Sequence, residues 1–488
     1  MSINQCTLRT VVVSIIFSIG LIHSQAAEPR TIPVGTSAEL KAALKKVEPG
    51  DTILFNAGVW TDLDCKVTVS GRSDAPITLR ADPQVTTFTG RCRVRLGGSF
   101  LVLQGFTFRN AWHEDAVLET RADSNHPADH CHISRCTFEN CNPPDLNEDS
   151  KVVSLYGASH EFQYCAIQGK RNRGATMVVW LGDGAGEHRI HHNYFGPRER
   201  LGKNGGETLR VGDSGTSHLS ARCIVRDNYF DRCNGEAEII SNKSYDNEYL
   251  YNTFHQCSGA LTLRHGGRSR VVGNFFDGRS ARGTGGVRII GEDHLVVCNL
   301  FSRLAGDDTR AALSIMNGLQ NSPADGYAPV ERACIAFNSF IDCKQSVVIG
   351  LTDDDNVGTV PPADCEFIGN IVNSRFGPLL RARTTLDGVR FIQNDFYGSE
   401  PGVDLEPSNL TVDPRWTIDS YGIPRLPQNS GLSVTSPMRP GTSQVTDIDG
   451  RVRMSPTTMG CVTASVDLPA RHPITAEEVG PAAAIANP

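Results

Sequence analysis

Two acidic side chains and one amide stand close together in the segments NGGETLRVG (204–212) and EAEIISNKS (236–244). Glu236 and Glu238 are two residues apart on a predicted strand, and side chains at that spacing point to the same face. With the amide of Asn204 they offer hard oxygen atoms, the ligands that Ca²⁺ prefers. The alternative is an outward-facing strand edge that binds no metal. The pattern therefore predicts either a calcium site or a solvated edge.

A lysine and an arginine follow these carboxylates at a suggestive spacing. Lys243 lies at the turn that leaves the predicted strand, and Arg264, in LTLRHGG (261–267), comes 21 residues later. That distance is near the length of one structural repeat, so both side chains can lie on one face beside the carboxylates. Lys243 can equally be a solvated turn residue. Taken together, the four charged residues predict one small site.

The middle of the chain is basic although the whole chain is acidic. Residues 168–310 contain 20 Lys and Arg against 16 Asp and Glu, while the complete chain has a net charge of −7. On consecutive repeats these cations would form a basic stripe suited to an acidic glycan, although each one alone can be a solvated turn residue. Four residues at comparable places in successive repeats are candidate substrate-binding groups or structural hydrogen-bonding groups: Arg210, His265, Arg288 and His294.

Length and composition exclude several classes of protein. The chain has 488 residues, of which 39% are hydrophobic and 21% charged, so neither a disordered chain nor a polytopic membrane protein fits. The acidic net charge argues against a general nucleic-acid binder. Residues 1–27 are typical of a secretory signal, with Arg9, an apolar run over 11–22 that is too short to span a bilayer, and small residues at 24–26. We therefore expect a secreted or periplasmic protein.

One short pattern recurs along the chain at steps of 22 to 39 residues. It consists of an apolar residue, any residue, Asn, any residue, and an aromatic or aliphatic residue, and the Asn positions are 193, 228, 252, 274, 299, 338, 370 and 394. Cys136 and Cys165 fill the Asn slot in two earlier copies. Short β-branched runs separated by Gly and polar turns predict the stacked coils of a parallel β-helix. The recurring Asn would tolerate left-handed backbone geometry and hydrogen-bond from coil to coil.

Two further columns follow from the same repeat. The aromatic two residues after the Asn points to the same side and predicts a stack of phenylalanines at 195, 230, 254 and 276. Cysteines three residues after the aromatic, at 141, 233, 257 and 343, are interpreted as small buried hydrophobic residues. A disulfide between neighbouring copies, such as Cys233 and Cys257, stays open.

The repeat also predicts how the chain is divided. Thr36-Ser37-Ala38-Glu39 is typical of a capping box, and the helix that follows would cover the N-terminal end of the solenoid. We expect an all-β, single-domain parallel β-helix over 28–400 behind the signal at 1–27. An irregular segment packed on the solenoid would follow over 401–462, and a flexible tail over 463–488.

The segments 204–212, 236–244, 261–267 and GGVRIIGEDH (285–294) resemble polysaccharide lyase family 6, which includes alginate lyases and chondroitinase B. The resemblance covers about residues 30 to 400 and is most specific over 204–294. It implies a right-handed parallel β-helix and β-elimination of a uronate-containing polysaccharide. It also implies that Asn204, Glu236 and Glu238 bind Ca²⁺, that Lys243 is the base, and that Arg264 is the acid.

The residue types suit that chemistry. The proton at C5 of a uronate is weakly acidic, and its removal builds charge on the adjacent carboxylate, which a bound calcium ion would neutralise. Lys243 must be uncharged to act as a base, so nearby Ca²⁺ and arginines would assist it and an alkaline pH optimum would follow. Arginine is a poor proton donor, so Arg264 can also act by stabilising the leaving oxygen.

Three functions compete. The first is a secreted, calcium-assisted lyase of acidic polysaccharide, with alginate favoured over dermatan sulfate by the general tendency of the family. The second is a β-helical glycoside hydrolase, for which Asp307-Asp308 and Asp353-Asp354-Asp355 are candidates, although turn-like sequence around them favours loop acids. The third is a β-helix that binds glycan without cleaving it. The sequence predicts no nucleic-acid partner and no membrane span, and it leaves the oligomeric state and the sugar-block preference open.

Overall fold

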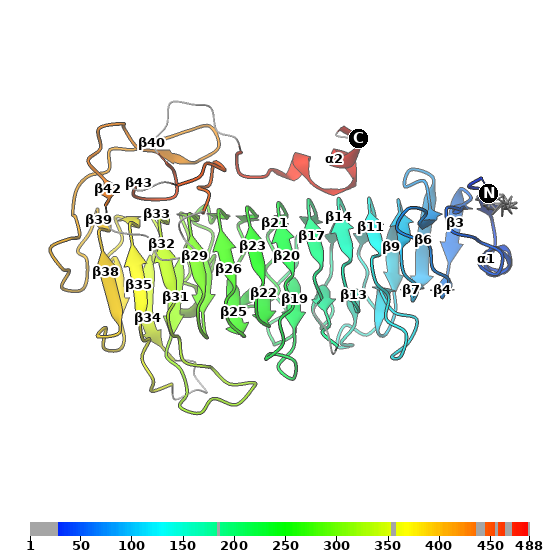
Figure 1. The fold of residues 1–488 in the computed structure, drawn as a ribbon, viewed down its shortest axis with the longest axis horizontal. Helices are drawn as coiled ribbons and strands as arrows, with labels where there is room; N and C mark the ends of the chain where they lie inside the picture. The colour runs from blue at the N-terminus through cyan, green and yellow to red at the C-terminus, as the bar shows by residue number, and fades with distance from the viewer. Residues whose placement is uncertain are drawn as a thin grey trace, which may run out of the picture.

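The backbone winds into a long solenoid whose coils each contribute one strand to three parallel sheets (Figure 1). The computed structural model describes residues 28–182, 186–352, 358–435, 445–453, 457–463 and 471–486. The expected signal at 1–27 and the acids at 353–355 lie outside these residues. Over the described chain, sheets A, B and C contain 14, 13 and 12 strands. The expected all-β parallel β-helix is confirmed.

Successive coils supply every third strand to the same sheet. Sheet A contains β1 (Thr31–Val34), β2 (Thr52–Phe55), β5 (Ile77–Arg80), β8 (Leu101–Gln104), β11 (His132–Ser134), β14 (Glu161–Gln163), β17 (Arg189–His191), β20 (Ile224–Arg226), β23 (Glu248–Leu250), β26 (Arg270–Val272), β29 (Leu295–Val297), β32 (Cys334–Ala336), β35 (Cys365–Ile368) and β38 (Val389–Ile392). Sheet B contains β3 (Gly58–Thr61), β6 (Thr86–Arg91), β9 (Thr107–Trp112), β12 (Thr137–Glu139), β15 (Ala166–Gln168), β18 (Tyr194–Phe195), β21 (Tyr229–Asp231), β24 (Thr253–His255), β27 (Phe275–Asp277), β30 (Leu300–Ser302), β33 (Ser339–Ile341), β36 (Ile371–Asn373) and β39 (Asp395–Tyr397). Sheet C contains β4 (Asp64–Val67), β7 (Arg93–Leu96), β10 (Ala116–Glu119), β13 (Lys151–Leu155), β16 (Met177–Val179), β19 (Leu209–Gly212), β22 (Glu238–Lys243), β25 (Ala260–His265), β28 (Val287–Ile289), β31 (Leu313–Met316), β34 (Val347–Leu351) and β37 (Leu380–Ala382).

The recurring asparagines form a continuous hydrogen-bonded ladder between sheets A and B. Each side-chain amide donates to the next asparagine's Oδ1, for example from Asn193 to Asn228 and from Asn228 to Asn252, both at 2.9 Å. Cys165 N donates to Asn193 Oδ1 at 2.9 Å, so the cysteine takes the slot the repeat gives it. The ladder continues to Asn409, which the repeat did not reveal. Buried amides that bond in this way lock the coil register.

The left-handed backbone at this bend belongs to the residue before each asparagine, not to the asparagine itself. His192 has φ 55°, and the same position in other coils has φ between 48° and 67° at Asp227, Tyr251, Gly273, Cys298, Phe337, Gly369 and Gln393. The asparagine is needed because of its amide, which satisfies backbone groups inside the solenoid.

The expected aromatic column also forms. Phe195, Phe230, Phe254 and Phe276 stack with centroid distances of 4.5 to 4.7 Å, and the column continues through Phe301 and Phe340. The cysteine column is buried, and Cys233 N donates to Cys257 Sγ at 3.4 Å without a disulfide between the two thiols. These columns fill the interior, because each coil buries its apolar face only against its neighbours.

Helix α1 (Ser37–Leu44) covers the N-terminal end, where Leu40 and Ala43 are buried. Thr36 Oγ1 accepts from Glu39 N at 3.2 Å, as a capping box requires. The second hydrogen bond of a capping box, from the N-cap backbone N–H to the Glu39 side chain, differs from expectation. Glu39 Oε2 accepts from Gly35 N at 2.6 Å and not from the N-cap residue Thr36.

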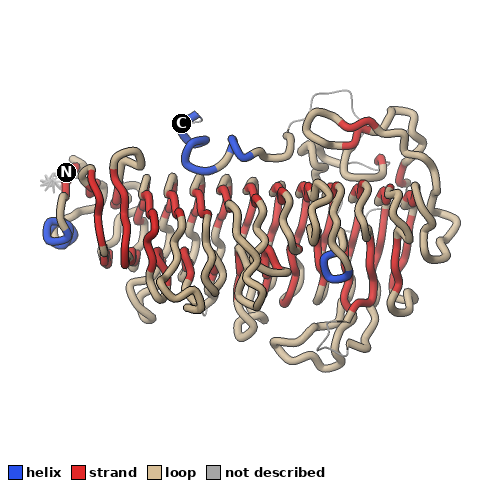
Figure 2. The backbone as a smooth tube through the Cα atoms, turned by 180° about the vertical axis from the view of Figure 1, so that it is seen from behind, coloured by secondary structure: helices blue, strands red, loops and turns tan. Residues whose placement is uncertain are grey.

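Chain beyond the last coil packs along the solenoid. Two short antiparallel pairs, β40 (Thr417–Ile418) with β41 (Pro424–Arg425) and β42 (Ser433–Val434) with β43 (Thr457–Thr458), lie at its C-terminal end (Figure 1). The 3₁₀ helix η2 (Ala476–Glu478) and helix α2 (Gly480–Ala486) return over the middle coils (Figure 2). Thr253 Oγ1 donates to Ile474 O at 2.8 Å, and Gly480 N donates to His192 O at 2.9 Å. These bonds hold residues that we expected to form a flexible tail.

No helix within the described ranges is long and apolar enough to cross a membrane.

Candidate active site

A cleft of about 450 Å³ opens on sheet C in the middle of the solenoid, around β22 and β25. Its walls come from five neighbouring coils, so residues distant in sequence meet there. Six of the nine site residues predicted from the sequence line it: Asn204, Glu236, Glu238, Lys243, Arg264 and Arg288. The carboxylates, the lysine and the arginine thus share one cleft.

Irregular pairing between β22 and β25 helps to aim these side chains. The register shifts between Glu238 and Ile240, and again after Asn242, where Lys243 pairs with His265 instead of Arg264. Such bulges add a residue to one strand and turn its side chains to a new direction. Glu236 lies in the bend before β22, so it reaches the cleft through that bend and not through the strand alternation we expected.

Three carboxylates, those of Glu207, Glu236 and Glu238, form one acidic wall of the cleft. Burial, together with the charges of Glu207 and Glu238, raises the pKa of Glu236 to about 7. Glu236 Oε2 accepts from the backbone N–H groups of Gly205 and Gly206, both at 3.0 Å. Glu238 forms an ion pair with Arg288. The Glu236 and Glu207 charges are therefore only partly balanced within the wall.

A buried arginine fixes the loop that carries Asn204. Arg198 is 3% exposed and donates to the carbonyl oxygens of Gly205 at 3.2 Å and Glu207 at 2.6 Å, and to oxygens of the preceding coil. The loop also approaches the turn at Gly235 too closely for any side chain, since a Cβ on Gly235 would lie 2.1 Å from Gly206 O. This approach brings the two N–H groups to Glu236.

The opposite wall holds Arg264 in place. Its Nη1 donates to Gly326 O at 2.9 Å and its Nη2 to Asp325 O at 3.1 Å, both in the loop between β31 and β32. The guanidinium group lies 4.1 Å from the ring centre of the buried Tyr327, which adds a cation–π contact. A fixed guanidinium group can stabilise negative charge on an oxygen in the cleft.

Three predicted residues lie elsewhere. Arg210, on β19, stacks over Trp180. His265 is buried beside Ser214, whose Oγ lies 3.3 Å from its Nε2, and burial and Arg264 lower the pKa of His265 to about 3. His294 is 1% exposed, its Nδ1 accepts from Ser269 N at 3.2 Å, and its Nε2 lies 3.0 Å from Ile290 O. Both ring nitrogens of His294 thus have partners inside the coil stack.

Several lining residues were not singled out as site residues. Glu207, Tyr327, Thr309 and Arg310 also line the cleft, as do Arg200 and Lys203 of the predicted basic stripe. Glu207 stands in the NGGETLRVG segment only three residues after Asn204, so the motif offered a signal for it. Six basic and three acidic side chains line the cleft, and this positive excess suits an anionic ligand.

The acidic wall suits a divalent cation. In the described part of the chain, no three His, Cys, Asp or Glu side chains converge as a ready metal site. However, Glu207 is 4% exposed and its Oε2 is buried without a hydrogen-bond partner among the described residues. A buried carboxylate oxygen without a donor, next to a second acid, is a position where a hard cation would relieve the repulsion.

Comparisons with known proteins agree with this architecture. A family model described as chondroitinase B matches residues 34–375, well over half of the chain. A comparison with curated proteins found no match. The structure of the PL6 family alginate lyase AlyGC has a TM-score of 0.82 and 30% identity, covering 92% of this chain and 58% of that one. This chain thus spans somewhat more than half of the AlyGC length.

Two further solved structures are similar. A mannuronic acid specific polysaccharide family 6 lyase from human gut microbiota has a TM-score of 0.72 and 29% identity, covering 79% of this chain and 91% of that one. The alginate lyase AlyF-OU02, solved in complex with G6, has a TM-score of 0.70 and 23% identity, covering 82% of this chain and 91% of that one, and supports the fold alone.

Proposed function

This chain belongs to the chondroitinase B family, polysaccharide lyase family 6, and we propose that it cleaves alginate by β-elimination. The observation that carries the proposal is that Lys243, Arg264 and the acidic wall share one basic cleft. The choice of alginate rests on the alginate lyase AlyGC and on the mannuronic acid specific lyase, at 30% and 29% identity.

In the proposed reaction, the amine of Lys243 takes the proton from C5 of the uronate next to the scissile bond. The electron pair of that C–H bond forms the C4–C5 double bond, and the bond between C4 and the glycosidic oxygen breaks. The leaving oxygen takes a proton, with Arg264 donating to it. A base in this position contributes roughly 10²- to 10⁴-fold to such a rate. The step consumes no water.

The walls of the cleft would prepare the substrate for that step. A calcium ion held by Asn204, Glu236 and Glu238, with Glu207 beside them, would neutralise the charge that grows on the uronate carboxylate. The carbonyls of Asp325 and Gly326 and the ring of Tyr327 hold Arg264 toward the leaving oxygen. Arg200 and Arg310 add positive charge where neighbouring carboxylates would lie.

Absorbance separates the competing functions. The protein is incubated with alginate, dermatan sulfate or pectate, with and without EDTA, and the ultraviolet band of the unsaturated uronate is followed. An alginate lyase generates that band from alginate and loses it in EDTA. A band from dermatan sulfate alone would reassign the substrate. Reducing ends without the band would indicate a hydrolase, and no product at all would indicate a glycan-binding protein.

The proposal includes export of the protein. It rests on the charged, apolar and small-residue order of residues 1–27. N-terminal sequencing of protein recovered from the periplasm or medium tests it, and a chain that keeps Met1 there would contradict it.

A further inference from the structure

The buried Arg198 lies behind the acidic wall and forms no ion pair with a carboxylate of the described residues. A buried arginine without an anionic partner is rare, because burying its charge costs stability. Its two terminal nitrogens donate five hydrogen bonds of 2.6 to 3.2 Å, and every acceptor is a neutral oxygen. The acceptors are the carbonyl oxygens of Asn172, Gly174, Gly205 and Glu207 and the hydroxyl of Thr176.

These hydrogen bonds join two coils. Three of them reach the turn at 172–176 in the preceding coil, and two reach the loop at 205–207. The turn is itself fixed, because the buried Lys170 donates to Asn172 Oδ1 and Asn172 Nδ2 donates to Glu148 O at 2.9 Å and to Ser150 Oγ at 3.0 Å. A buried network with these partners gives the guanidinium group a rigid support.

Arg198 reaches the acidic wall through the backbone of the loop. Its Nη2 donates to Gly205 O at 3.2 Å, and the N–H of the same peptide group, on Gly206, donates to Glu236 Oε2 at 3.0 Å. Its Nη1 donates to Glu207 O at 2.6 Å and so fixes the backbone that carries the Glu207 side chain. One side chain thus orients the surroundings of two carboxylates.

The turn at Gly235 packs against the same group. A Cβ on Gly235 would lie 2.1 Å from Gly206 O and 2.9 Å from Arg198 Nε, so a larger residue would displace the loop. The φ of Gly235 is outside the left-handed region, so its backbone conformation is open to alanine. Close packing of the loop is therefore the reason for glycine here.

The charge of Arg198 acts against a cation in the wall. Burial lowers the pKa of the Arg198 guanidinium group to about 10, although the charges of Glu207 and Glu236 raise it, so the group stays protonated at neutral pH. A positive charge near a metal site weakens metal binding by repulsion. The hydrogen bonds and the charge of Arg198 therefore have opposite effects on a bound cation.

We propose that Arg198 is a positioning residue that sets the calcium affinity of the acidic wall. It holds the loop at 204–207 from behind, so that Asn204 and Glu207 line the same cleft as Glu236 before a metal ion binds. This inference rests on the proposed function, because it assumes that the acidic wall binds calcium. Positioning outweighs repulsion, so removing Arg198 weakens calcium binding instead of strengthening it.

Calorimetry with calcium alone tests the proposal on Arg198→Lys and Arg198→Met. Lysine keeps the charge but has only three donors and no planar fork, so we expect about tenfold weaker calcium binding. Methionine removes all five hydrogen bonds, so we expect about 100-fold weaker binding. Arg109→Met, at an exposed arginine on sheet B, is the control and should bind calcium as the unmodified protein does.

The calcium dependence of activity provides a second measurement. The calcium concentration that gives half-maximal formation of unsaturated uronate should rise in Arg198→Lys by the same factor as the dissociation constant, and saturating calcium should restore kcat. A role in folding alone would lower thermal stability without shifting this concentration. Gly235→Ala keeps the arginine but displaces the loop, so it should also weaken calcium binding, and it decides the question if neither Arg198 variant folds.

Two results would overturn the role of Arg198 and leave the lyase proposal standing. One is an unchanged calcium affinity in folded Arg198→Lys and Gly235→Ala, and the other is tighter binding in Arg198→Met, which repulsion alone predicts. If the unmodified protein binds no calcium, the metal assignment of the proposed function fails and this inference fails with it.

Discussion

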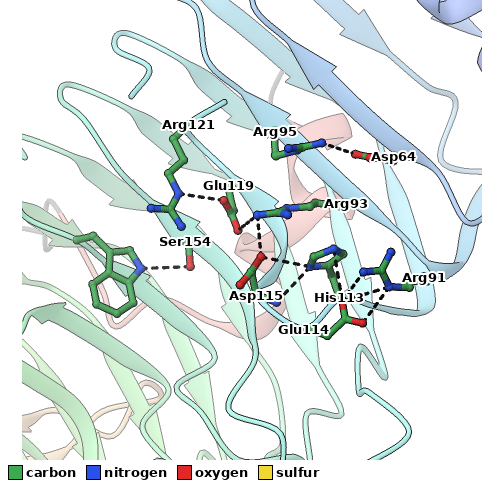
Figure 3. A network of polar contacts seen from close by, with 11 residues as sticks. Asp64, Arg91, Arg93, Arg95, His113, Glu114, Asp115, Glu119, Arg121 and Ser154 are labelled. Carbon is green, nitrogen blue, oxygen red and sulfur yellow. Dashed lines mark hydrogen bonds and ion pairs between the residues drawn. The ribbon is translucent and has the colours of Figure 1, made fainter. Parts of the chain in front are cut away.

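Two stretches of the same solenoid use arginine and acid in opposite ways. In the first coils, the charges neutralise one another: Arg93 donates to the buried Glu119, and Arg95 pairs with Asp64 (Figure 3). In the middle coils, around the cleft, Arg200 and Arg310 have no ion pair among the described residues, and the acids crowd one wall. The same fold and the same residue types thus stabilise one region and prepare the other for an anionic ligand.

This difference indicates where function lies in a repetitive protein. Stacked coils repeat the backbone, so the fold alone does not distinguish one coil from another. Unpaired charge distinguishes the functional coils, because a buried unpaired charge lowers stability unless a ligand or metal ion balances it. Substitutions should therefore separate the regions: changes in the middle coils lower activity, and changes in the first coils lower stability.

The largest effect is expected at Lys243. Lys243→Ala should lower kcat on alginate by roughly 10²- to 10⁴-fold, because the base is removed, while circular dichroism and thermal unfolding stay unchanged. Formation of unsaturated uronate measures the rate. Lys344→Ala, an exposed lysine outside the cleft, is the control and should keep full activity. Retained activity in Lys243→Ala would remove the base assignment.

The acidic wall gives the next effect. Glu236→Ala should weaken calcium binding about 100-fold, since it removes a charged ligand, and its activity should match that of the unmodified protein in EDTA. Calorimetry with calcium alone measures the affinity. Glu199→Ala, an exposed acid of the neighbouring loop, should bind calcium as before. A Glu236 variant with unchanged calcium affinity would contradict the metal assignment.

In the first coils, we expect a substitution to lower stability and to leave activity unchanged. Asp51 is 2% exposed and accepts from Arg30 and from Glu48 N, and the hydrogen bond from Arg30 lowers its pKa to about 2. Asp51→Asn should lower the free energy of unfolding by about 2 kcal/mol at neutral pH, with activity unchanged. Denaturant titration measures the loss. Reduced kcat at full stability would contradict the separation of the two regions.

The smallest expected effect is the pH dependence of stability, which differs in sign between Asp51 in the first coils and Glu236 in the cleft. The pKa of Asp51 is lowered, so its stabilising contribution is present above about pH 4 and disappears as the pH falls toward 2. The pKa of Glu236 is raised, so its contribution is present below about pH 4.5 and disappears as the pH rises through about 7. Calcium-free protein should therefore lose a few degrees of Tm between about pH 5 and 8.

Glu236→Gln should remove that loss of Tm, and calcium should reverse it in the unmodified protein. If the Tm of the calcium-free protein depends on pH in the same way with and without Glu236→Gln, repulsion among the carboxylates of the acidic wall does not lower its stability.

Much of the fold could be predicted from the sequence, because each repeat in the sequence corresponds to one coil of the solenoid. The asparagine ladder and phenylalanine column require one residue type at one position in each coil, and a periodic pattern shows both directly. It could not show that the residue before Asn193 carries the left-handed backbone, since many residue types occupy that position. Nor could it reveal Asn409, which joins the ladder from outside the repeat.

The site was predictable where chemistry and spacing coincide. Asn204, the Glu236–Glu238 pair, Lys243 and Arg264 stand in short segments one coil apart, so the sequence indicated their meeting. The loop contacts that hold Arg264, from Asp325 and Gly326, come from about 60 residues away and no spacing reveals them. The sequence could not show that His265 and His294 are buried, because burial depends on the three-dimensional structure.

We propose that the cleft in the middle coils breaks the sugar chain by elimination and not by hydrolysis. The most direct test is to digest alginate in water enriched in the heavy isotope of oxygen and to weigh the products by mass spectrometry. Elimination predicts unsaturated ends that contain no heavy oxygen from the cleavage, because water takes no part in the reaction. Saturated products that carry one heavy oxygen atom per bond cleaved, on one of the two new ends, would contradict it.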